Sequence, residues 1–207
     1  MIWLLVAAPV VAVFLWLANG IRLIGRVSRG ERIGERSGRA LLLIDLQAVF
    51  WAGRAYSDAS KARAQAAVLA EVAAARASGT PVIAVRQEWS IPSTRVLARL
   101  VMKGQAIAGT SGTDLAAPFK AAPDHILIKR VQDAFETGEL DRLLASLNVG
   151  TLRICGLDAC YCVARTAQAG LARGFQVELA SEAILATDET ARQKAFKQLA
   201  AEGATVL

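Results

Sequence analysis

An apolar run that ends in a charged residue recurs along this chain and constrains its fold. In the first, Ala40-Leu41-Leu42-Leu43-Ile44-Asp45, no polar residue precedes the aspartate. A strand that is apolar on both faces is typical of a parallel sheet covered by helices on each side. Further apolar runs occupy 81–86, 126–129, 151–155, 175–180 and 204–207, and helical patterns occupy 57–78, 140–147, 162–173 and 188–202. This alternation predicts a three-layer α/β/α domain with a six-stranded, mostly parallel sheet.

A longer apolar stretch lies at the N-terminus. Residues Ile2 to Ile21 carry no charge, and these 20 residues would span about 30 Å as a helix, the thickness of a hydrocarbon core. Six arginines and two glutamates follow within 22–39, so this segment carries +4 of the chain's net +6. The pattern predicts a transmembrane anchor at 1–21, a basic juxtamembrane linker at 22–39 and a globular domain at 40–207. The positive-inside rule places that domain in the cytoplasm, as part of a single-pass protein of the cell membrane.

A cleaved signal peptide is the alternative for this stretch. Its uncharged start and the poor cleavage site at Trp16-Leu17-Ala18 favour an uncleaved anchor.

Residues 40–207 keep a net charge of only about +2, so no nucleic-acid partner is expected for the globular domain. Self-association into a homo-oligomer is left open.

Three cysteines, Cys155, Cys160 and Cys162, lie within eight positions. An odd, clustered set does not form a disulfide framework, and no second Cys/His pair is present to complete a zinc site. Cys162 opens a helical pattern that follows a strand and a glycine turn, which places its thiol at the carboxyl edge of the sheet. At a helix N-terminus the thiol pKa is expected below its free value, as suits a nucleophile. A buried structural cysteine is the alternative.

Two other predicted strands end at the same edge, in Asp45 and Lys129. A carboxylate beside Cys162 can take the thiol proton, and an ammonium nearby keeps that carboxylate ionised. Backbone N–H groups of the turn before Cys162 can stabilise an oxyanion. Taken alone, Asp45 could equally cap the next loop, and Lys129 could be a solvated edge residue.

From Ala40 onward the chain resembles the isochorismatase-like cysteine hydrolases, which include nicotinamidases and related amidases. The matching pieces are Leu42-Leu43-Ile44-Asp45-Leu46-Gln47 with Phe50, Gly109-Thr110 with Gly112-Thr113, Lys129 with Ala134-Phe135, and Gly156 followed by Cys162-Val163 and Thr166-Ala167. The resemblance implies an Asp45-Lys129-Cys162 triad. It also implies a non-proline cis peptide at Leu157–Asp158, an oxyanion hole from the N–H groups of Asp158 and Cys162, and a small-molecule substrate that contacts Gln47 and Phe50.

The chain departs from nicotinamidases at their metal ligands, an Asp and two His. Its single histidine, His125, lies elsewhere, so no metal and no cofactor are expected, and nicotinamide is not the expected substrate. The presence of Cys162 favours C–N hydrolysis over the vinyl-ether hydrolysis of true isochorismatases. The sequence therefore predicts a membrane-anchored hydrolase of amide-type bonds that works through a Cys162 acyl-enzyme. A vinyl-ether hydrolase and a non-catalytic binding module on the same fold are the alternatives.

Overall fold

The computed structural model describes the backbone of residues 2–207 and the side chains of residues 9–207. Six strands form one sheet in the order β3-β2-β1-β4-β5-β6. The strands are β1 (Gly38–Ile44), β2 (Val82–Gln87), β3 (His125–Lys129), β4 (Val149–Gly156), β5 (Gln176–Ile184) and β6 (Thr205–Val206). Every neighbouring pair is parallel. The predicted six-stranded sheet is confirmed, and it is wholly rather than mostly parallel.

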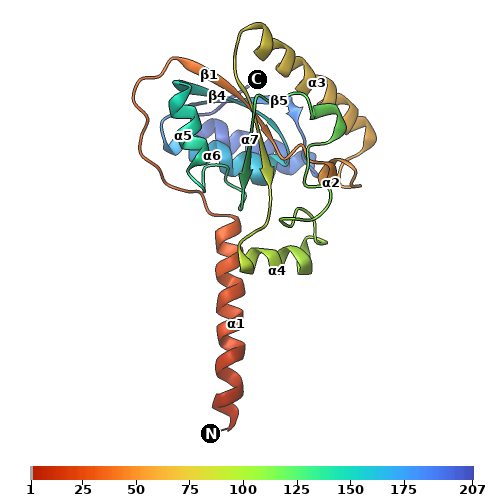
Figure 1. The fold of residues 1–207 in the computed structure, drawn as a ribbon, viewed down its shortest axis with the longest axis vertical. Coiled ribbons are helices and arrows are strands. Elements are labelled where there is room, and N and C mark those ends of the chain that lie inside the picture. The colour runs from red at the N-terminus through yellow and green to blue at the C-terminus, as the bar shows by residue number, and fades with distance from the viewer. Residues whose placement is uncertain (1) are drawn as a thin grey trace.

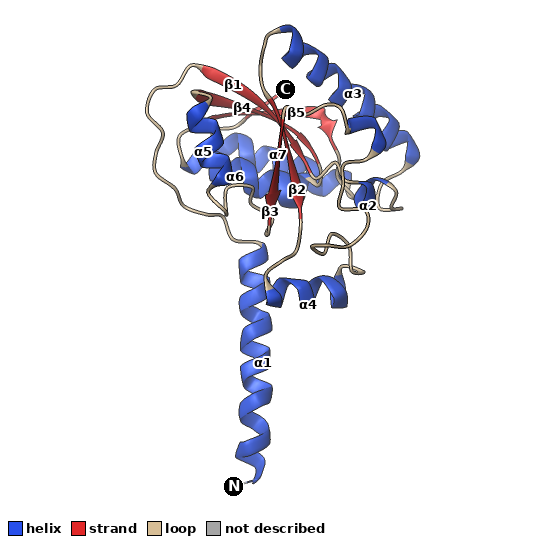
Figure 2. Cartoon of the chain, viewed as in Figure 1, coloured by secondary structure: helices blue, strands red, loops and turns tan. Residues whose placement is uncertain are grey.

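Helices cover both faces of this sheet (Figures 1 and 2). The helices of the described residues are α1 (Ile2–Ile24), α2 (Ala48–Trp51), α3 (Asp58–Ala77), α4 (Pro92–Val101), α5 (Glu139–Ser146), α6 (Ala164–Ala172) and α7 (Glu189–Ala201), with a 3-10 helix η1 (Ala117–Phe119) and a π-helical turn η2 (Ala159–Val163). Helix α3 packs on one face, and α5, α6 and α7 pack on the other. The predicted α/β/α layering is confirmed.

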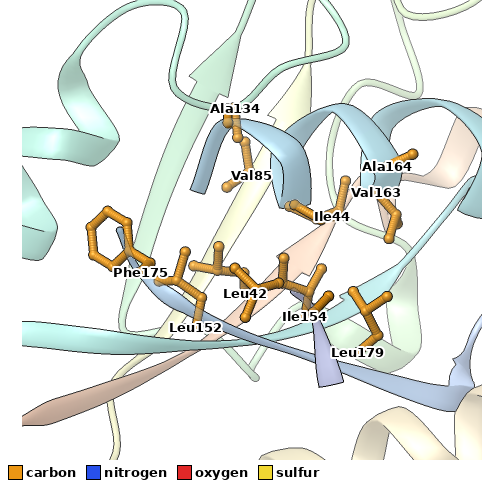
Figure 3. Close-up of a cluster of buried hydrophobic side chains, with 14 of the residues drawn as sticks. Leu42, Ile44, Val85, Ala134, Leu152, Ile154, Val163, Ala164, Phe175 and Leu179 are labelled. Carbon is orange, nitrogen blue, oxygen red and sulfur yellow. The ribbon is translucent and has the colours of Figure 1, made fainter. Parts of the chain in front are cut away.

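The central strand β1 contributes side chains to two separate cores. Leu42 and Ile44 pack with Ile154 of β4 and Val163 of η2 on one face (Figure 3). Leu41 and Leu43 pack under α3 on the other face. Alternate side chains of a strand point to opposite sides of its sheet. The unbroken apolar run from Ala40 is therefore explained by burial on both faces.

A third apolar cluster lies below the sheet, where α1 meets α4. Trp89, Leu97 and Ile24 are buried in this cluster. A Cβ added at Gly20 would lie 2.8 Å from Leu97 Cδ1, so the two helices cross closely at that glycine. The sequence predicts no helix between 86 and 126, so α4 is a helix that the sequence pattern misses. Pro92 in the first turn of α4 is the signal that could have located this helix.

Within the part of the chain that the structure describes, no helix is both long and apolar enough to cross a membrane. The transmembrane helix predicted at 1–21 is therefore not confirmed. Met1 and the side chains of residues 2–8 lie outside the described part.

The segment between α1 and β1 lies against the domain. Residues 26–37 form no regular secondary structure. The Ser28 N–H donates to Asp133 Oδ2 at 2.7 Å, and the Ile33 N–H donates to the Arg173 carbonyl at 2.8 Å. The predicted linker is thus attached to the globular domain at two points at least.

Candidate active site

The three residues of the predicted triad come together at the carboxyl edge of the sheet. Lys129 Nζ lies 3.0 Å from Asp45 Oδ2 and 3.2 Å from Cys162 Sγ. The Asp45 and Lys129 side chains are almost fully buried, and Cys162 is partly exposed. Asp45 follows β1, Lys129 ends β3 and Cys162 lies in η2 after β4. Parallel strands end at one edge, which is why residues far apart in the sequence meet here.

Backbone geometry at the end of β1 turns Asp45 out of the strand. Asp45 has φ of 55°, a left-handed conformation that is uncommon for a non-glycine residue and recurs at functional sites. Its N–H donates to the Val85 carbonyl at 2.9 Å, and its own carbonyl accepts from the Gln47 N–H at 2.7 Å. On the neighbouring strand, a Cβ at Gly156 would collide with the backbone of Ile44. Only glycine allows the turn that carries Cys162 to lie this close to Asp45.

Oxygen atoms surround the Lys129 ammonium. Besides Asp45 Oδ2, it donates to Gln87 Oε1 and to the Val131 carbonyl, the latter at 3.3 Å. The register pairs Lys129 with Gln87 on β2. Burial alone would lower the pKa of Lys129, but the negative charge of Asp45, with a smaller contribution from the contact with Cys162, outweighs this effect and raises it. The ammonium is therefore positively charged at neutral pH.

The Cys162 thiol differs from the sequence expectation. Burial, and then the charge of Asp45, raise the pKa of Cys162 above its ordinary value, although Lys129 opposes this. Cys162 also lies within η2 rather than opening α6, which begins at Ala164. The predicted depression of the thiol pKa is therefore wrong. Desolvation outweighs the nearby ammonium, so the resting thiol is protonated.

The Asp45 carboxylate is placed to receive the thiol proton. Burial raises the pKa of Asp45, while Lys129 and, to a smaller extent, the nearby Cys162 lower it. Its Oδ2 is bonded to Lys129, whereas its buried Oδ1 has no nitrogen or oxygen partner among the described residues. The free oxygen can accept the thiol proton while Lys129 compensates the charge.

The turn before Cys162 is held by the carboxylate of Asp158. The Leu157–Asp158 peptide bond is cis, as predicted. Asp158 Oδ1 accepts from the Cys160 N–H at 2.8 Å, and Oδ2 accepts from the Thr187 N–H at 3.0 Å and Tyr56 Oη at 3.2 Å. No acceptor for the Asp158 N–H is found among residues 2–207. That N–H is free to bind an oxyanion, in line with its predicted role.

Tyr56 is a site residue that the sequence interpretation missed. Its hydroxyl reaches Asp158 from the loop before α3, about one hundred positions away in the chain. A single tyrosine in a polar loop carries no signal for this contact, because only the fold brings the two residues together.

Gln47 supports the site from behind and does not line it. Its side chain is fully buried. Gln47 Oε1 accepts from the Gln87 N–H at 2.7 Å, and Nε2 donates to the carbonyls of Gln87 at 3.0 Å and Thr113 at 2.7 Å. These bonds occupy the amide group, so the predicted substrate contact at Gln47 is corrected to a scaffolding role. Phe50 packs partly buried beside the α1–α4 cluster, and its contact with substrate stays a prediction.

No group of three or more His, Cys, Asp or Glu side chains among the described residues is arranged to hold a metal ion. The expected absence of a metal and of a cofactor stays a prediction.

Comparison with known proteins agrees with this fold. The family model described as the isochorismatase domain matches residues 39–207. Because this match covers most of the chain, the chain belongs to the isochorismatase family. Among curated proteins, streptothricin hydrolase of Streptomyces noursei is 29% identical over 151 residues, which is 72% of this chain. The chain spans only about half, 54%, of the length of that relative.

Two solved structures show the same architecture. N-carbamoylsarcosine amidase from Thermoplasma acidophilum superposes with a TM-score of 0.70 at 25% identity, over 82% of this chain and 95% of that one. The pyrazinamidase/nicotinamidase of Streptococcus mutans UA159 gives a TM-score of 0.69 at 24% identity, over 82% of this chain and 100% of that one. The second likeness is evidence of fold alone.

Proposed function

We propose that this chain is a cysteine hydrolase that cleaves an amide-type C–N bond of a small molecule through an acyl-enzyme on Cys162. The observation that carries the proposal is the contact of one buried ammonium, Lys129, with both Asp45 at 3.0 Å and Cys162 at 3.2 Å. The names of two relatives, a streptothricin hydrolase and an N-carbamoylsarcosine amidase, support the same class of reaction.

In the first half of the reaction, Cys162 Sγ attacks the amide carbonyl carbon while its proton passes to Asp45 Oδ1. The carbonyl oxygen becomes an oxyanion, which the N–H groups of Asp158 and Cys162 bind. The C–N bond then breaks, and the amine leaves with the proton held by Asp45. Lys129 keeps Asp45 ionised before the attack and stabilises negative charge on sulfur as it develops.

In the second half, water attacks the carbonyl carbon of the thioester, and Asp45 takes one of its protons. The C–S bond breaks, the acid product leaves, and the proton returns to Cys162 Sγ. Asp45 is thus a base towards the nucleophile and an acid towards the leaving group in each half. The proton that burial retains on the resting thiol is the one that the leaving amine needs.

A screen of small primary amides, N-carbamoyl compounds and lactams tests the proposal. The full chain and its Cys162→Ala variant are incubated with each compound, and released amine or ammonia is measured. Acid quenching followed by peptide mass spectrometry should show an acyl group on Cys162. Binding of compounds without turnover in both proteins would instead support the non-catalytic module, and turnover of a vinyl ether but no amide would support the other alternative.

Membrane attachment through residues 2–21 is the second part of the proposal. It is supported by the absence of charge from Ile2 to Ile21 and by the arginines that follow. Apolar side chains in the described part of α1, among them Val10, Phe14 and Leu15, are exposed, and α1 projects away from the domain (Figure 1). With the arginines on the cytoplasmic side, the hydrolase domain is proposed to face the cytoplasm.

Fractionation and protease protection test this attachment. The full chain should sediment with membranes and resist carbonate extraction. Protease added to intact cells should leave the domain uncut, and detergent should expose it. Digestion from outside, a soluble protein, or a mature N-terminus near Asn19 would contradict the proposed topology.

A further inference from the structure

We infer that the segment from Ile24 to Gly30, which lies outside the matched family domain of 39–207, positions Lys129 for the reaction. This inference rests on the proposed function, because it gives the segment a role in the same site. Three observations lead to it: the contacts of the loop after β3, the buried groups that hold Ser28, and the tight environment of Gly30.

The loop that follows Lys129 is hydrogen-bonded to the segment that follows α1. The Lys129 ammonium donates to the carbonyl of Val131 at 3.3 Å. The next residue, Gln132, donates its N–H to the carbonyl of Ile24 at 3.1 Å. Asp133 then accepts from the Ser28 N–H at 2.7 Å. The backbone that supplies an oxygen to Lys129 is therefore attached directly to the end of α1 and to the residues after it.

Two buried charged side chains, Asp133 and Arg173, hold Ser28 in place. Asp133 is fully buried, and its second oxygen accepts from the Phe135 N–H at 2.8 Å. Arg173 is 2% exposed and donates to the Ser28 carbonyl at 3.0 Å and to Ser28 Oγ at 3.1 Å. It is fixed in turn by Asp141 at 2.8 Å and lies over the Phe135 ring at 4.6 Å.

These contacts form one connected path from Arg173 through Ser28 and Asp133 to the carbonyl of Val131 and the ammonium of Lys129. Buried charged groups tolerate little displacement, because losing the contact with a partner leaves a buried charge uncompensated. A shift of Ser28 is therefore passed to the loop and alters the contact of Lys129 with Cys162. Lys129 lowers the pKa of the Cys162 thiol, so a looser Lys129 should raise that pKa.

Gly30 in this segment and Gly34, four positions after it, provide a matched pair of variants. A Cβ at Gly30 would lie 2.5 Å from Arg173 Nε and 2.7 Å from Arg173 Cζ, whereas a Cβ at Gly34 would meet nothing within 4 Å. Gly30→Ala therefore displaces the guanidinium that holds Ser28, and Gly34→Ala makes the same chemical change without a contact. Neither glycine is part of the triad or its turn.

The readout is the rate of Cys162 alkylation by iodoacetamide as a function of pH. It is measured on the full chain in detergent and resolved from Cys155 and Cys160 by peptide mass spectrometry. Gly30→Ala should react about tenfold more slowly near neutrality, since sub-ångström displacement of a reacting group is costly, and its pH profile should move to higher pH. Gly34→Ala should match the wild type in both respects.

A second variant guards against misfolding of the first. Asp133→Asn keeps the size of the side chain and removes the charge that Ser28 binds, so its pH profile should move in the same direction. Unchanged pH profiles in Gly30→Ala and Asp133→Asn would overturn the inference, as would slower alkylation without a shift in pH. The readout does not need a substrate, so a failure of the inference is distinguishable from a failure to hydrolyse amides.

Discussion

The Lys129 ammonium lies 3.0 Å from the Asp45 carboxylate, and the two side chains are 0% and 2% exposed. Burying an isolated charge away from water costs folding free energy. A buried ion pair offsets this cost but adds little net stability compared with apolar residues of the same size. The pair is therefore better explained by chemistry than by stability. Its third neighbour, the Cys162 thiol at 3.2 Å from Lys129, indicates which chemistry it serves.

The first prediction concerns removal of the ammonium. Lys129→Met should lower kcat by about 100-fold or more, the usual range for losing acid–base assistance. Because Lys129 lowers the burial-raised pKa of Asp45, its loss raises that pKa further. The ionised base then persists only at higher pH, so the acid limb of the pH–rate profile should move upward. Steady-state rates at closely spaced pH values measure this shift.

The stability of the same variant provides the control. At pH 7, Lys129→Met should lose about 3–5 kcal/mol in urea unfolding, the usual cost of breaking one side of a buried pair. The double variant Asp45→Asn with Lys129→Met should recover part of this loss while staying inactive. An acid limb that stays in place in Lys129→Met would show that Lys129 does not act on Asp45 during turnover.

The second prediction separates the two neighbouring cysteines. Cys162→Ser should abolish hydrolysis, because a serine hydroxyl is a poorer nucleophile than a thiol and the Asp45 carboxylate is too weak a base to activate it. Cys160→Ser should leave at least half of the activity, since its contact with Asp158 is made by its backbone N–H and survives substitution. Initial rates of both variants, measured with an amide that the wild-type protein hydrolyses, test this prediction. Loss of activity in Cys160→Ser alone would mean that the nucleophile has been misassigned.

The third prediction tests Tyr56 as a positioning residue. Burial raises the pKa of Asp158, and the Tyr56 hydroxyl is one of the groups that lowers it. Tyr56→Phe removes that bond and should lower kcat about three- to tenfold, in keeping with about 1 kcal/mol for one hydrogen bond. KM should change little, because Tyr56 holds the turn rather than the substrate.

Tyr161→Phe is the matched control for this change. Tyr161 lies in the same turn and is 54% exposed, so loss of its hydroxyl should leave kcat and stability as they are. Equal effects of the two substitutions on kcat would remove the reason for assigning a role to the Tyr56–Asp158 bond.

The fourth prediction distinguishes a scaffold residue from a substrate contact. Gln47→Leu leaves three backbone groups, the N–H and carbonyl of Gln87 and the carbonyl of Thr113, without their side-chain partner. It should lower the free energy of unfolding by at least about 3 kcal/mol, at roughly 1–3 kcal/mol per unsatisfied buried group. It should alter KM little. Phe50→Ala should instead raise KM with kcat nearly unchanged, the pattern of lost substrate binding. A raised KM with unchanged stability in Gln47→Leu would reverse this assignment.

Much of the site was predictable because its residues follow strands. Asp45 and Lys129 end apolar runs, and Cys162 follows another, so an alternating pattern of strands and helices already places all three at one edge. Gln47 was misread because it shares the motif of Asp45, and sequence proximity does not reveal which way a side chain turns. Helix α4 was missed although Pro92 marks its first turn, because the glycine-rich stretch 104–112 that follows it is typical of a loop.

The protonation state of Cys162 was beyond the sequence. A helix N-terminus and a lysine both favour a thiolate, but the extent of burial depends on how η2 packs against β1 and β3. Desolvation then decides the sign of the pKa shift. Tyr56 and the contacts of Ser28 with Asp133 and Arg173 join residues about one hundred positions apart or more, and no local pattern encodes such distances.

The sequence by itself determined the layered α/β fold, the parallel sheet and the edge at which Asp45, Lys129 and Cys162 meet. These follow from apolar periodicity and strand direction, which are local properties of the chain. Only the tertiary structure decided that Gln47 is a scaffold, that the thiol is protonated and that the segment after α1 contacts the loop of Lys129. Burial and long-range contacts are properties of the packed molecule, because they depend on which surfaces the fold removes from water.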